Sequence, residues 1–354
     1  MAGIAFTLRE LVRRDDLYSV TRGYLLAGLI STGPWLFTIA ALLMVEIAAT
    51  GSVGAEAVTQ FRGVIVYNFA FSLVFSGPIV WVTTRYVADC VYDNKLAPVP
   101  GTLFISLGAV ALSSLLIAGP YYYFGTDLPT MVKVAAVMNY MLVAATWVVG
   151  VFLSVLRGYL LYAVTFCLGI MGAAGVASLL NPMYGVMGLL SGFNLGLSVV
   201  VFSLLGRVLI AFPYDFRRPV GFASYFRRYW DLVLFGFIAA LALWIDKWVM
   251  WFAPEASLTE SGMRFFYDYD NAMFLVYLSV IPGLTYLFLS VETGLDEKVR
   301  SYLRAANGEA TRAQLEIERK EVSNFVIERL RTIIVIQGTV SVLIAFFAPQ
   351  ILVD

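Results

Sequence analysis

Two adjacent charged residues, Asp246 and Lys247, lie deep inside an apolar segment of the sequence. A charged group costs at least ~2.5–3.5 kcal/mol at the centre of a bilayer, so it usually faces a cavity or a partner. Trp244, Trp248 and Trp251 recur on the same predicted helix. At ~100° per residue, Asp246 points roughly away from them. If the tryptophans face lipid, Asp246 faces the interior of the bundle, where it can contact a passing substrate. Alternatively, Lys247 snorkels to the interface and the tryptophans form an aromatic belt there.

Other candidate site residues lie near the ends of apolar segments. Glu46 ends the first segment and Arg62 opens the second, so we predict that both line the substrate pathway with the central pair. For Arg62, anchoring to a lipid phosphate is an equally good interpretation. We predict a cytoplasmic entrance at Arg85, Asp89 and Arg157. Because Arg85 and Asp89 are one helical turn apart, a structural ion pair is the alternative there.

Several residue types needed for catalysis are missing. The chain has no histidine, which is the commonest general base and metal ligand. Cys90 and Cys167 are too far apart in the sequence to form a metal-binding motif, so we expect buried small residues. No Gly-rich phosphate loop followed by Lys-Ser/Thr occurs. Asp268 and Asp270 have the spacing of a nucleotide-sugar site, but we interpret them as the start of a helix. We therefore predict no enzyme activity, cofactor or metal.

Aromatic residues make up 15% of the chain and include 20 tyrosines. Sugar rings stack on aromatic faces, and tyrosine hydroxyls can bond sugar hydroxyls. Most of these residues will pack between helices, but four are candidates for sugar contacts: Tyr67, Tyr86, Tyr140 and Tyr159.

The elements that must position these residues are membrane-spanning helices. Of 354 residues, 60% are hydrophobic and 14% charged, and the mean hydropathy of +0.82 is typical of a polytopic membrane protein. Net charge is zero, which does not suggest a nucleic-acid partner. We predict an all-α bundle with nine spanning helices at about 22–49, 63–84, 101–124, 132–156, 158–180, 183–206, 230–252, 268–290 and 332–352.

The basic residues predict the orientation of these spans. Twenty of the 24 Lys and Arg residues fall on one side if the N-terminus is cytoplasmic. Only Arg62, Lys133 and Arg264 lie in the predicted outer loops, and Lys247 lies within a span. Because cytoplasmic loops are enriched in Lys and Arg, we predict a cytoplasmic N-terminus.

Gly and Pro residues predict kinks in three spans. Gly33-Pro34 interrupts the first, since proline removes a backbone donor and clashes with the preceding turn. Gly77-Pro78 and Pro282-Gly283 lie in the second span of each part of the chain. Interrupted helices at matching places in two repeats are typical of transporters.

Two segments are predicted outside the spans. Residues 1–20 have the pattern of an amphipathic helix at the membrane surface, or of an ordinary lead-in helix. The charged segment 291–331 is predicted to be a cytoplasmic helical hairpin. An apolar stripe in its second helix can dock a cytosolic partner or pack on the bundle itself, and comprises Val322, Phe325, Val326 and Leu330.

Four parts of the sequence resemble the Pel exopolysaccharide exporters, a family of the multidrug/oligosaccharidyl-lipid/polysaccharide (MOP) flippase superfamily. They are residues 1–15 (MAGIAFTLRELVRRD), 30–35 (ISTGPW), 244–248 (WIDKW) and the charged connection 292–331. The resemblance implies two six-helix lobes facing each other across a V-shaped cavity, in a bacterial inner membrane. It also implies transport of the nascent polysaccharide to the periplasm, with a cytosolic glycosyltransferase and membrane-bound subunits as partners. Nine of the expected twelve spans are predicted here.

We expect the following parts: 1–20 as interfacial helix, 21–207 as first lobe, 208–229 as inter-lobe connection, 230–290 as spans seven and eight, 291–331 as hairpin and 332–354 as span nine. Export of the Pel polymer is the predicted function. The alternatives are a scaffold that recruits the glycosyltransferase, and a flippase for lipid-linked oligosaccharides or drugs. A membrane glycosyltransferase would need a catalytic base and a cytosolic donor site, and the sequence offers neither.

Overall fold

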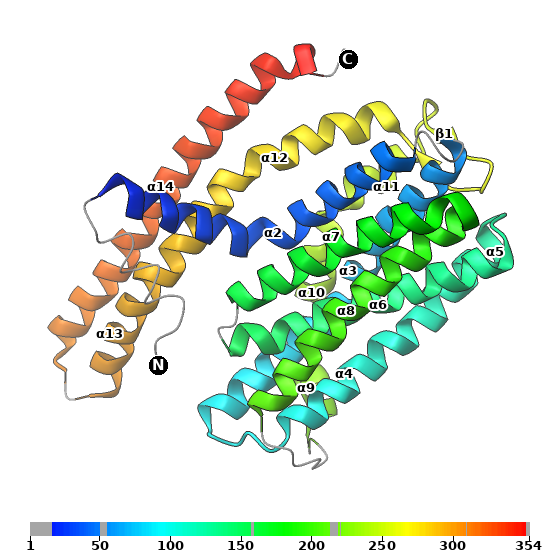
Figure 1. Cartoon of the computed structure of the whole chain (residues 1–354). Helices are drawn as coiled ribbons and strands as arrows, with labels where there is room; N and C mark the ends of the chain where they lie inside the picture. The colour runs from blue at the N-terminus through cyan, green and yellow to red at the C-terminus, as the bar shows by residue number, and fades with distance from the viewer. Residues whose placement is uncertain are drawn as a thin grey trace. The chain divides into compact units, whose positions relative to one another are not determined.

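The computed structural model is almost entirely helical (Figure 1). It describes residues 16–49, 55–156, 159–212, 219, 221–308 and 310–351. The helices are α2 (Leu17–Ala49), α3 (Ala55–Tyr92), α4 (Val99–Ser113), α5 (Gly119–Gly125), α6 (Thr130–Val155), α7 (Tyr159–Tyr184), α8 (Val186–Ala211), α9 (Phe222–Arg228), α10 (Trp230–Ala242), α11 (Ile245–Met250), α12 (Tyr267–Ser290), α13 (Asp296–Asn307) and α14 (Arg312–Ile351). Two π-helical turns, η1 (Ser114–Ala118) and η2 (Val291–Leu295), and a hairpin of β1 (Ser257–Leu258) and β2 (Arg264–Phe265) complete the described elements.

Seven of the described helical segments are long and apolar enough to cross a membrane, or eight if the bent helix α2 is one span. The segment predicted to span at 230–252 is the exception, and a single helix there is wrong. It is broken at Leu243 and Trp244 into α10 and the six-residue α11. No Gly or Pro marks this break. Asp246 lies in the first turn of α11, where an acid is favoured by the helix dipole.

The predicted kinks have mixed outcomes. Helix α2 bends between Thr21–Gly33 and Leu36–Ala49, as expected for Gly33-Pro34. Helices α3 and α12 continue through Pro78 and Pro282, so an interruption of the helix there is wrong, while the predicted kinks stay predictions. A long apolar helix can keep its course through a proline because packing against neighbours compensates for the missing bond. Two π-turns also occur in the described helices: η1 lies between α4 and α5, directly before Gly119-Pro120, and η2 follows α12.

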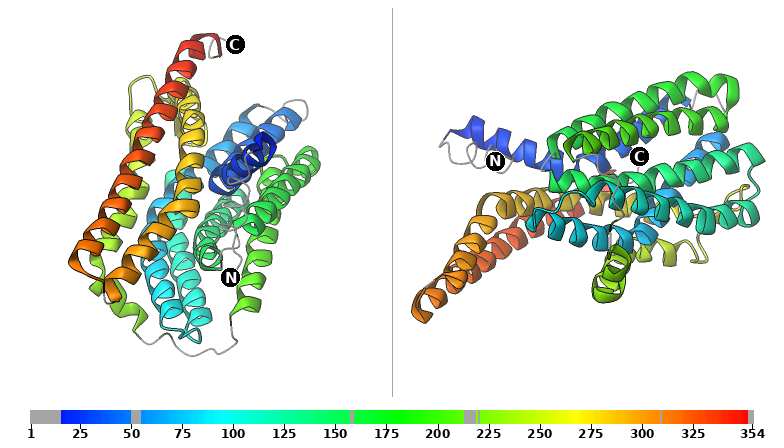
Figure 2. Two further views of the ribbon diagram at one scale, coloured as in Figure 1. Left: turned by 90° about the vertical axis from the view of Figure 1, so that its left-hand side faces the viewer. Right: turned by 90° about the horizontal axis from the view of Figure 1, so that it is seen from below.

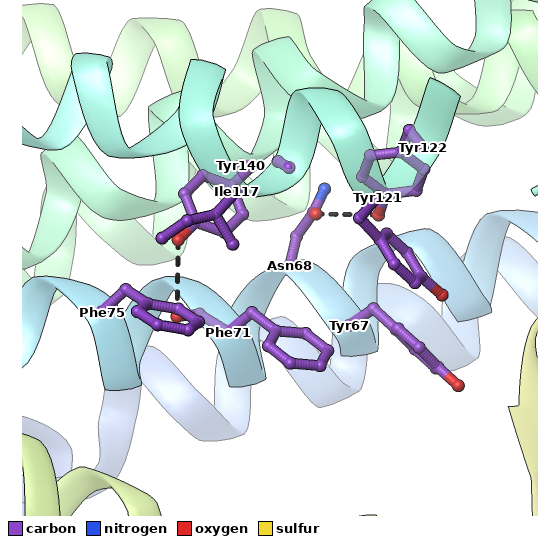
Figure 3. A pocket seen from close by; sticks show the side chains of 9 residues that line it. Tyr67, Asn68, Phe71, Phe75, Ile117, Tyr121, Tyr122 and Tyr140 are labelled. Atoms are coloured by element: carbon purple, nitrogen blue, oxygen red, sulfur yellow. Dashed lines mark hydrogen bonds between the residues drawn. The ribbon is translucent and has the colours of Figure 1, made fainter. Parts of the chain in front are cut away.

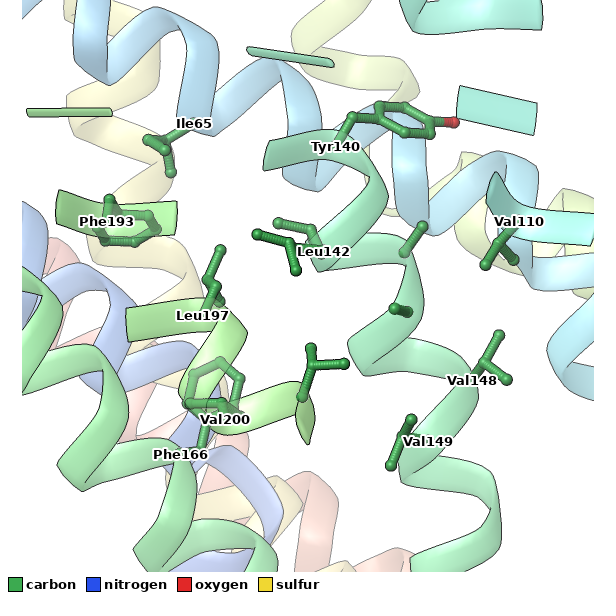
Figure 4. Close-up of a cluster of buried hydrophobic side chains, with 14 of the residues drawn as sticks. Ile65, Val110, Tyr140, Leu142, Val148, Val149, Phe166, Phe193, Leu197 and Val200 are labelled. Atoms are coloured by element: carbon green, nitrogen blue, oxygen red, sulfur yellow. The ribbon is translucent and has the colours of Figure 1, made fainter. Parts of the chain in front are cut away.

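The described helices cluster into two compact units. One comprises the residues from Trp35 to Phe266. Its core lies between α3, α6 and α8, with α4 and α7 packed around them (Figure 4). Phe193 of α8 meets Phe61 of α3 edge-to-face at 5.7 Å. Large apolar side chains such as Phe152 and Leu189 are fully buried there, which stabilises the unit through apolar burial.

Small residues bring α7 and α8 into close contact in this unit. Gly188, Gly192 and Gly196 recur every fourth residue along α8 and face α7. A Cβ on Gly188 would lie only 2.5 Å from the carbonyl oxygen of Leu180. Small residues at this spacing let membrane helices approach closely enough for backbone contact. Gly185, with φ of +56°, makes the turn between the two helices.

The second unit comprises the described residues up to Pro34 together with those from Tyr267 onward. Asp16 caps α2 by accepting a hydrogen bond from the Ser19 N–H at 2.9 Å. Residues 1–15 of the predicted 1–20 helix lie outside the described residues, and 17–20 form the start of α2. Helices α12 and α14 run side by side in both views of Figure 2. Gln337 of α14 donates to Ser279 of α12 at 3.2 Å.

In this second unit α13 and α14 form the helical hairpin predicted for 291–331, and α14 continues as one helix into the predicted span nine. Lys298 and Glu321 form an ion pair at 2.9 Å across it. The expected division of the chain into two lobes at 208–229 stays a prediction.

Candidate functional site

Helix α3 carries two neighbouring stripes of side chains along its length. Tyr67, Phe71 and Phe75 form the first, which we call the aromatic stripe. Asn68, Ser72 and Ser76 are each one position further along and form the second, the polar stripe. All three members of the polar stripe are buried. Polar groups inside a membrane helix are expensive and often functional, so this helix is the strongest candidate for a site.

Asn68 of the polar stripe belongs to a buried chain of hydrogen bonds. The side-chain amide of Asn68 donates to Asn139 of α6 at 2.9 Å and to the Ala136 carbonyl at 2.8 Å. Asn139 in turn donates to Asn194 of α8 at 2.8 Å. The Tyr122 hydroxyl donates to Asn68 from the other side, also at 2.8 Å. Each bond is directional, so the network holds α3, α5, α6 and α8 in one arrangement.

The aromatic stripe faces α10 and α11. Trp251 lies on Tyr67 with ring centres 4.5 Å apart and an interplanar angle of 5°. Trp248 lies on Phe71 at 4.5 Å and 19°. The ring centres of Phe75 and of Phe237 in α10 are 6.3 Å apart. The predicted lipid-facing position of the tryptophans is therefore wrong for Trp248 and Trp251, because both pack against α3.

The hairpin of β1 and β2 covers one end of the aromatic stripe. The Tyr67 hydroxyl donates to the Arg264 carbonyl at 2.8 Å and accepts from the Arg264 N–H at 3.0 Å. Met263 and Phe265 are buried against Gly63 of α3. A Cβ on Gly63 would lie within 2.8 Å of Met263, so only glycine fits there without a shift. The segment predicted as a plain loop is thus a packed cap.

A cavity of about 150 Å³ lies beside the two stripes (Figure 3). Ile117 and Ala118 of η1 form part of its wall, and π-turns are frequent at functional sites. Figure 3 shows the aromatic stripe and Asn68 on α3, with Ile117 of η1 and the tyrosines of α5 beside them. The lining is almost entirely apolar and comprises Tyr67, Asn68, Phe71, Phe75, Ile117, Ala118, Tyr121, Tyr122 and Tyr140.

The predicted pathway residues Asp246 and Lys247 lie together in α11. The Oδ1 atom of Asp246 is buried, and Lys247 lies 5.7 Å from the centre of the Trp244 ring. In the sequence, Asp246 is two residues before Trp248, so it belongs to the segment that covers the aromatic stripe. Glu46 of α2 and Arg62 of α3 are half-buried, and their role in a pathway stays a prediction.

At the other end of α3, the predicted ion pair is confirmed. Arg85 and Asp89 are 3.1 Å apart. Tyr225 of α9 donates to Asp89 at 3.2 Å, and the Arg85 guanidinium lies 5.4 Å from the centre of the Tyr229 ring. Partial burial, followed by the Asp89 carboxylate, raises the pKa of Tyr225. The cluster joins α3 to α9. The predicted cytoplasmic entrance at these residues stays a prediction. Arg157 lies outside the described residues.

The predicted docking stripe on α14 is used in part by the hairpin itself. Phe325 packs against Gly294 of η2. Arg329 donates to the Tyr286 hydroxyl at 2.7 Å, and its guanidinium lies 4.9 Å from the Phe325 ring centre. Val322 and Val326 are half-buried, whereas Leu330 is 50% exposed. Only part of the predicted stripe remains open to a partner.

Metal-ligating side chains do not converge in the described part of the chain: no group of three or more His, Cys, Asp or Glu residues is placed to hold an ion. The site consists of neutral amides, hydroxyls and aromatic rings. Such groups can bind and guide a neutral, hydroxyl-rich ligand, and they offer no general base among them.

Sequence reasoning identified Tyr67 and Tyr140 as candidates but missed the asparagine network. Asn68, Asn139 and Asn194 each stand alone in an apolar helix, which is the available signal for a buried interhelical bond. The aromatic stripe was also detectable, because its residues recur at i, i+4 and i+8 on α3. The contact of this stripe with Trp248 was not detectable, because no Gly or Pro in the sequence signals the break between α10 and α11.

Comparison with known proteins identifies the family and the fold. The family model described as "PelG: Putative exopolysaccharide Exporter (EPS-E)" matches residues 1–353. No curated protein sequence matches. A solved multidrug resistance MATE family transporter of the MOP superfamily, in an outward-facing conformation, is 14% identical with a TM-score of 0.55, covering 97% of this chain and 75% of that one. A MOP superfamily transporter from Pyrococcus furiosus is 13% identical with a TM-score of 0.56 over the same shares.

Proposed function

The chain belongs to the PelG family of exopolysaccharide exporters, and from this premise we propose that it moves the Pel polymer from the cytoplasm to the periplasm. The family match over residues 1–353 is the observation that carries the proposal. The solved relatives add the fold of MOP transporters and, at 13–14% identity, nothing about their ligands. The family match does not favour a scaffold or a drug flippase. The test is export of polymer by cells that carry or lack this chain.

We place the protein in the bacterial inner membrane with its N-terminus in the cytoplasm. The support is the number of long apolar helices and the distribution of basic residues. Single cysteines introduced into a chain with Cys90→Ala and Cys167→Ala test the orientation. A cysteine at Arg217 or Arg218 should be protected from an impermeant thiol reagent in intact spheroplasts. A cysteine at Leu258, which is 62% exposed, should react. The opposite pattern would contradict the orientation.

We propose a cytosolic glycosyltransferase and membrane subunits as partners, with α13 and α14 as the docking hairpin. Leu330 is the exposed member of the predicted apolar stripe. Leu330→Glu should reduce co-purification of the glycosyltransferase, because a charge replaces an apolar contact. Ile317→Glu, at a 58% exposed position on the same helix, is the matched control. Equal co-purification by both variants would remove Leu330 from the docking surface.

Asp246 is the residue we propose to contact the passing sugar chain, through amino groups on the polymer. Its support is the half-buried carboxylate on the segment beside the aromatic stripe. Asp246→Asn removes the charge at constant shape and should lower export several-fold at normal protein abundance. Asp231→Asn is the control, because Asp231 is an exposed acid in the first turn of α10. Wild-type export by Asp246→Asn would refute the role.

The transporter assignment also predicts that the purified chain consumes no sugar nucleotide without partners. Release of nucleoside diphosphate from purified chain alone would favour the glycosyltransferase interpretation. The same assay with the added cytosolic fraction provides the positive control.

A further inference from the structure

The aromatic stripe is covered by rings that lie flat on it. Trp251 and Tyr67 are parallel within 5°, and Trp248 and Phe71 within 19°. Other aromatic pairs in the same unit meet edge-on, such as Trp81 and Phe235 at 89°. A flat, parallel stack presents a ring face to a ring face, and the apolar face of a pyranose engages an aromatic ring in the same way.

The segment that supplies the two tryptophans is short and follows a break in the helix. Helix α11 has six residues and is separated from α10 by a non-helical break. Among the residues that the structure describes, the buried indole N–H of Trp248 has no hydrogen-bond acceptor. A buried donor without a partner is destabilising relative to one that meets water or a ligand. The stacked arrangement therefore carries an energetic cost, which would be relieved if the Trp248 N–H reached a hydrogen-bond acceptor elsewhere.

The other side of the same stripe has room to adjust. The cavity of about 150 Å³ is lined by Phe71, Phe75 and Tyr121, so these rings are not closely packed on every side. Tyr121 also lies 5.7 Å from Tyr67 and 6.2 Å from Phe71. Phe71 can therefore change its tilt without displacing the polar stripe.

We propose that the aromatic stripe is a binding site for pyranose rings, and that Trp248 and Trp251 are its resident occupants, displaced when a sugar chain binds. The inference rests on the proposed function, since an exported polysaccharide supplies the rings. It goes further by naming the contact surface on α3 and the part of the chain that must move.

Hydrogen exchange on the purified full chain tests the displacement directly. The protein is placed in lipid nanodiscs free of sugar-headed detergent, and chitopentaose is the probe. Binding should speed amide exchange in residues 245–251 and leave exchange at Asn139, in the polar network, unchanged. Unchanged exchange at 245–251 at saturating probe overturns the proposal. Faster exchange with an alkane chain but not with chitopentaose also overturns it, in favour of an apolar ligand.

Two substitutions predict opposite changes in affinity. Phe71→Ala removes the binding surface and should weaken chitopentaose binding several-fold. Trp248→Ala removes the resident occupant and should strengthen it several-fold. If the rings only pack the protein, both substitutions weaken binding or neither changes it, and the proposal fails. Phe235→Ala, at a 51% exposed ring on α10, is the control and should bind like wild type.

Folding of each variant is checked by its elution as a single peak before binding is measured. Should Trp248→Ala fail this check, Trp248→Leu provides the same removal of a flat ring with less lost volume. Binding to the purified protein is measured without any export. Unchanged export by cells that lack the chain therefore counts against the proposed function even if binding is intact, and intact export without binding counts against this inference.

Discussion

The two stripes of α3 lie side by side but are held in different ways. On the polar stripe, Asn68 is fixed by three hydrogen bonds to Tyr122, Asn139 and the Ala136 backbone. On the aromatic stripe, Phe71 is covered by Trp248 through stacking alone. A buried hydrogen bond is lost when one partner turns away, whereas a stacked ring can be replaced by any other flat face.

The difference indicates which side of α3 is rigid and which is exchangeable. The polar side joins α3 to α5, α6 and α8 and keeps those helices in one register. The aromatic side joins α3 to α10 at Phe75 and, at Phe71, to the short helix α11, which has a break before it. We infer that the hydrogen-bonded side fixes the position of α3, so that the rings stacked on the aromatic side can be exchanged without moving the helix. Each prediction below disturbs one side and leaves the other intact.

The largest expected effect is on the rigid side. Asn139→Leu removes the bond from Asn68 and the bond to Asn194. The free energy of unfolding should fall by about 1–3 kcal/mol, because buried amides lose partners; interhelical bonds in membranes average nearer ~0.6 kcal/mol each, which favours the lower part of this range. Thermal unfolding followed by size-exclusion chromatography gives the measurement.

The control for Asn139→Leu is Asn324→Leu, at an exposed position on α14. This variant should unfold at the wild-type temperature. An unchanged midpoint for Asn139→Leu as well would show that the network contributes specificity of packing and no net stability.

A second prediction concerns the point at which α10 is fixed to α3. A Cβ on Gly236 would lie 2.6 Å from the Gly77 carbonyl oxygen, so the two backbones are in contact. Gly77→Ala should destabilise the protein by about 1–3 kcal/mol, because the helices must separate. Gly108→Ala, with no atom near its Cβ position, should instead stabilise by about 0.5–1 kcal/mol. Equal midpoints for the two variants would contradict the close contact.

This contact also shows how far the sequence could predict the site. Gly77-Pro78 drew attention to this part of α3 as a predicted kink, and the structure adds that Gly77 packs closely against Gly236. Apolar length predicted most helices, since bilayer crossing is a local property of a segment. The tight contact could not be predicted, because it depends on which helix lies opposite.

The candidate site shows the same limit. Arg85 and Asp89 were predictable as a pair, since one helical turn separates them. The contact of Trp248 with Phe71 joins residues far apart in sequence, and a periodic pattern gives only the face of a helix. With Trp244, Trp248 and Trp251 on one face, either lipid or another helix satisfies the pattern.

A smaller effect is expected where the hairpin is attached to the aromatic stripe. Tyr67→Phe removes both hydrogen bonds to the Arg264 backbone and keeps the ring stacked on Trp251. Because Arg264 is exposed and water can replace the hydroxyl, stability should fall by only about 0.5–1.5 kcal/mol. The Arg264 amide should exchange faster, while Trp251 fluorescence stays unchanged. Tyr123→Phe, at a 67% exposed ring, should change neither.

The smallest effect tests whether this attachment responds to pH. Glu260, in the loop between β1 and β2, shares a hydrogen bond with Glu56 of α3, and this bond, with the Glu56 charge, raises the pKa of Glu260 above 4.5. The folded state therefore holds this proton more tightly than the unfolded chain. The stabilisation is complete below pH 4.5 and is lost as the pH rises through the raised pKa of Glu260.

Glu260→Gln mimics the protonated acid. Its melting temperature should match that of the wild type below pH 4.5 and slightly exceed it once the pH has passed the raised pKa of Glu260. Glu255→Gln, an exposed acid in the same segment, should follow wild type throughout. If Glu260→Gln loses stability with rising pH as wild type does, another group is responsible, and the hairpin is held on the aromatic stripe independently of its acids.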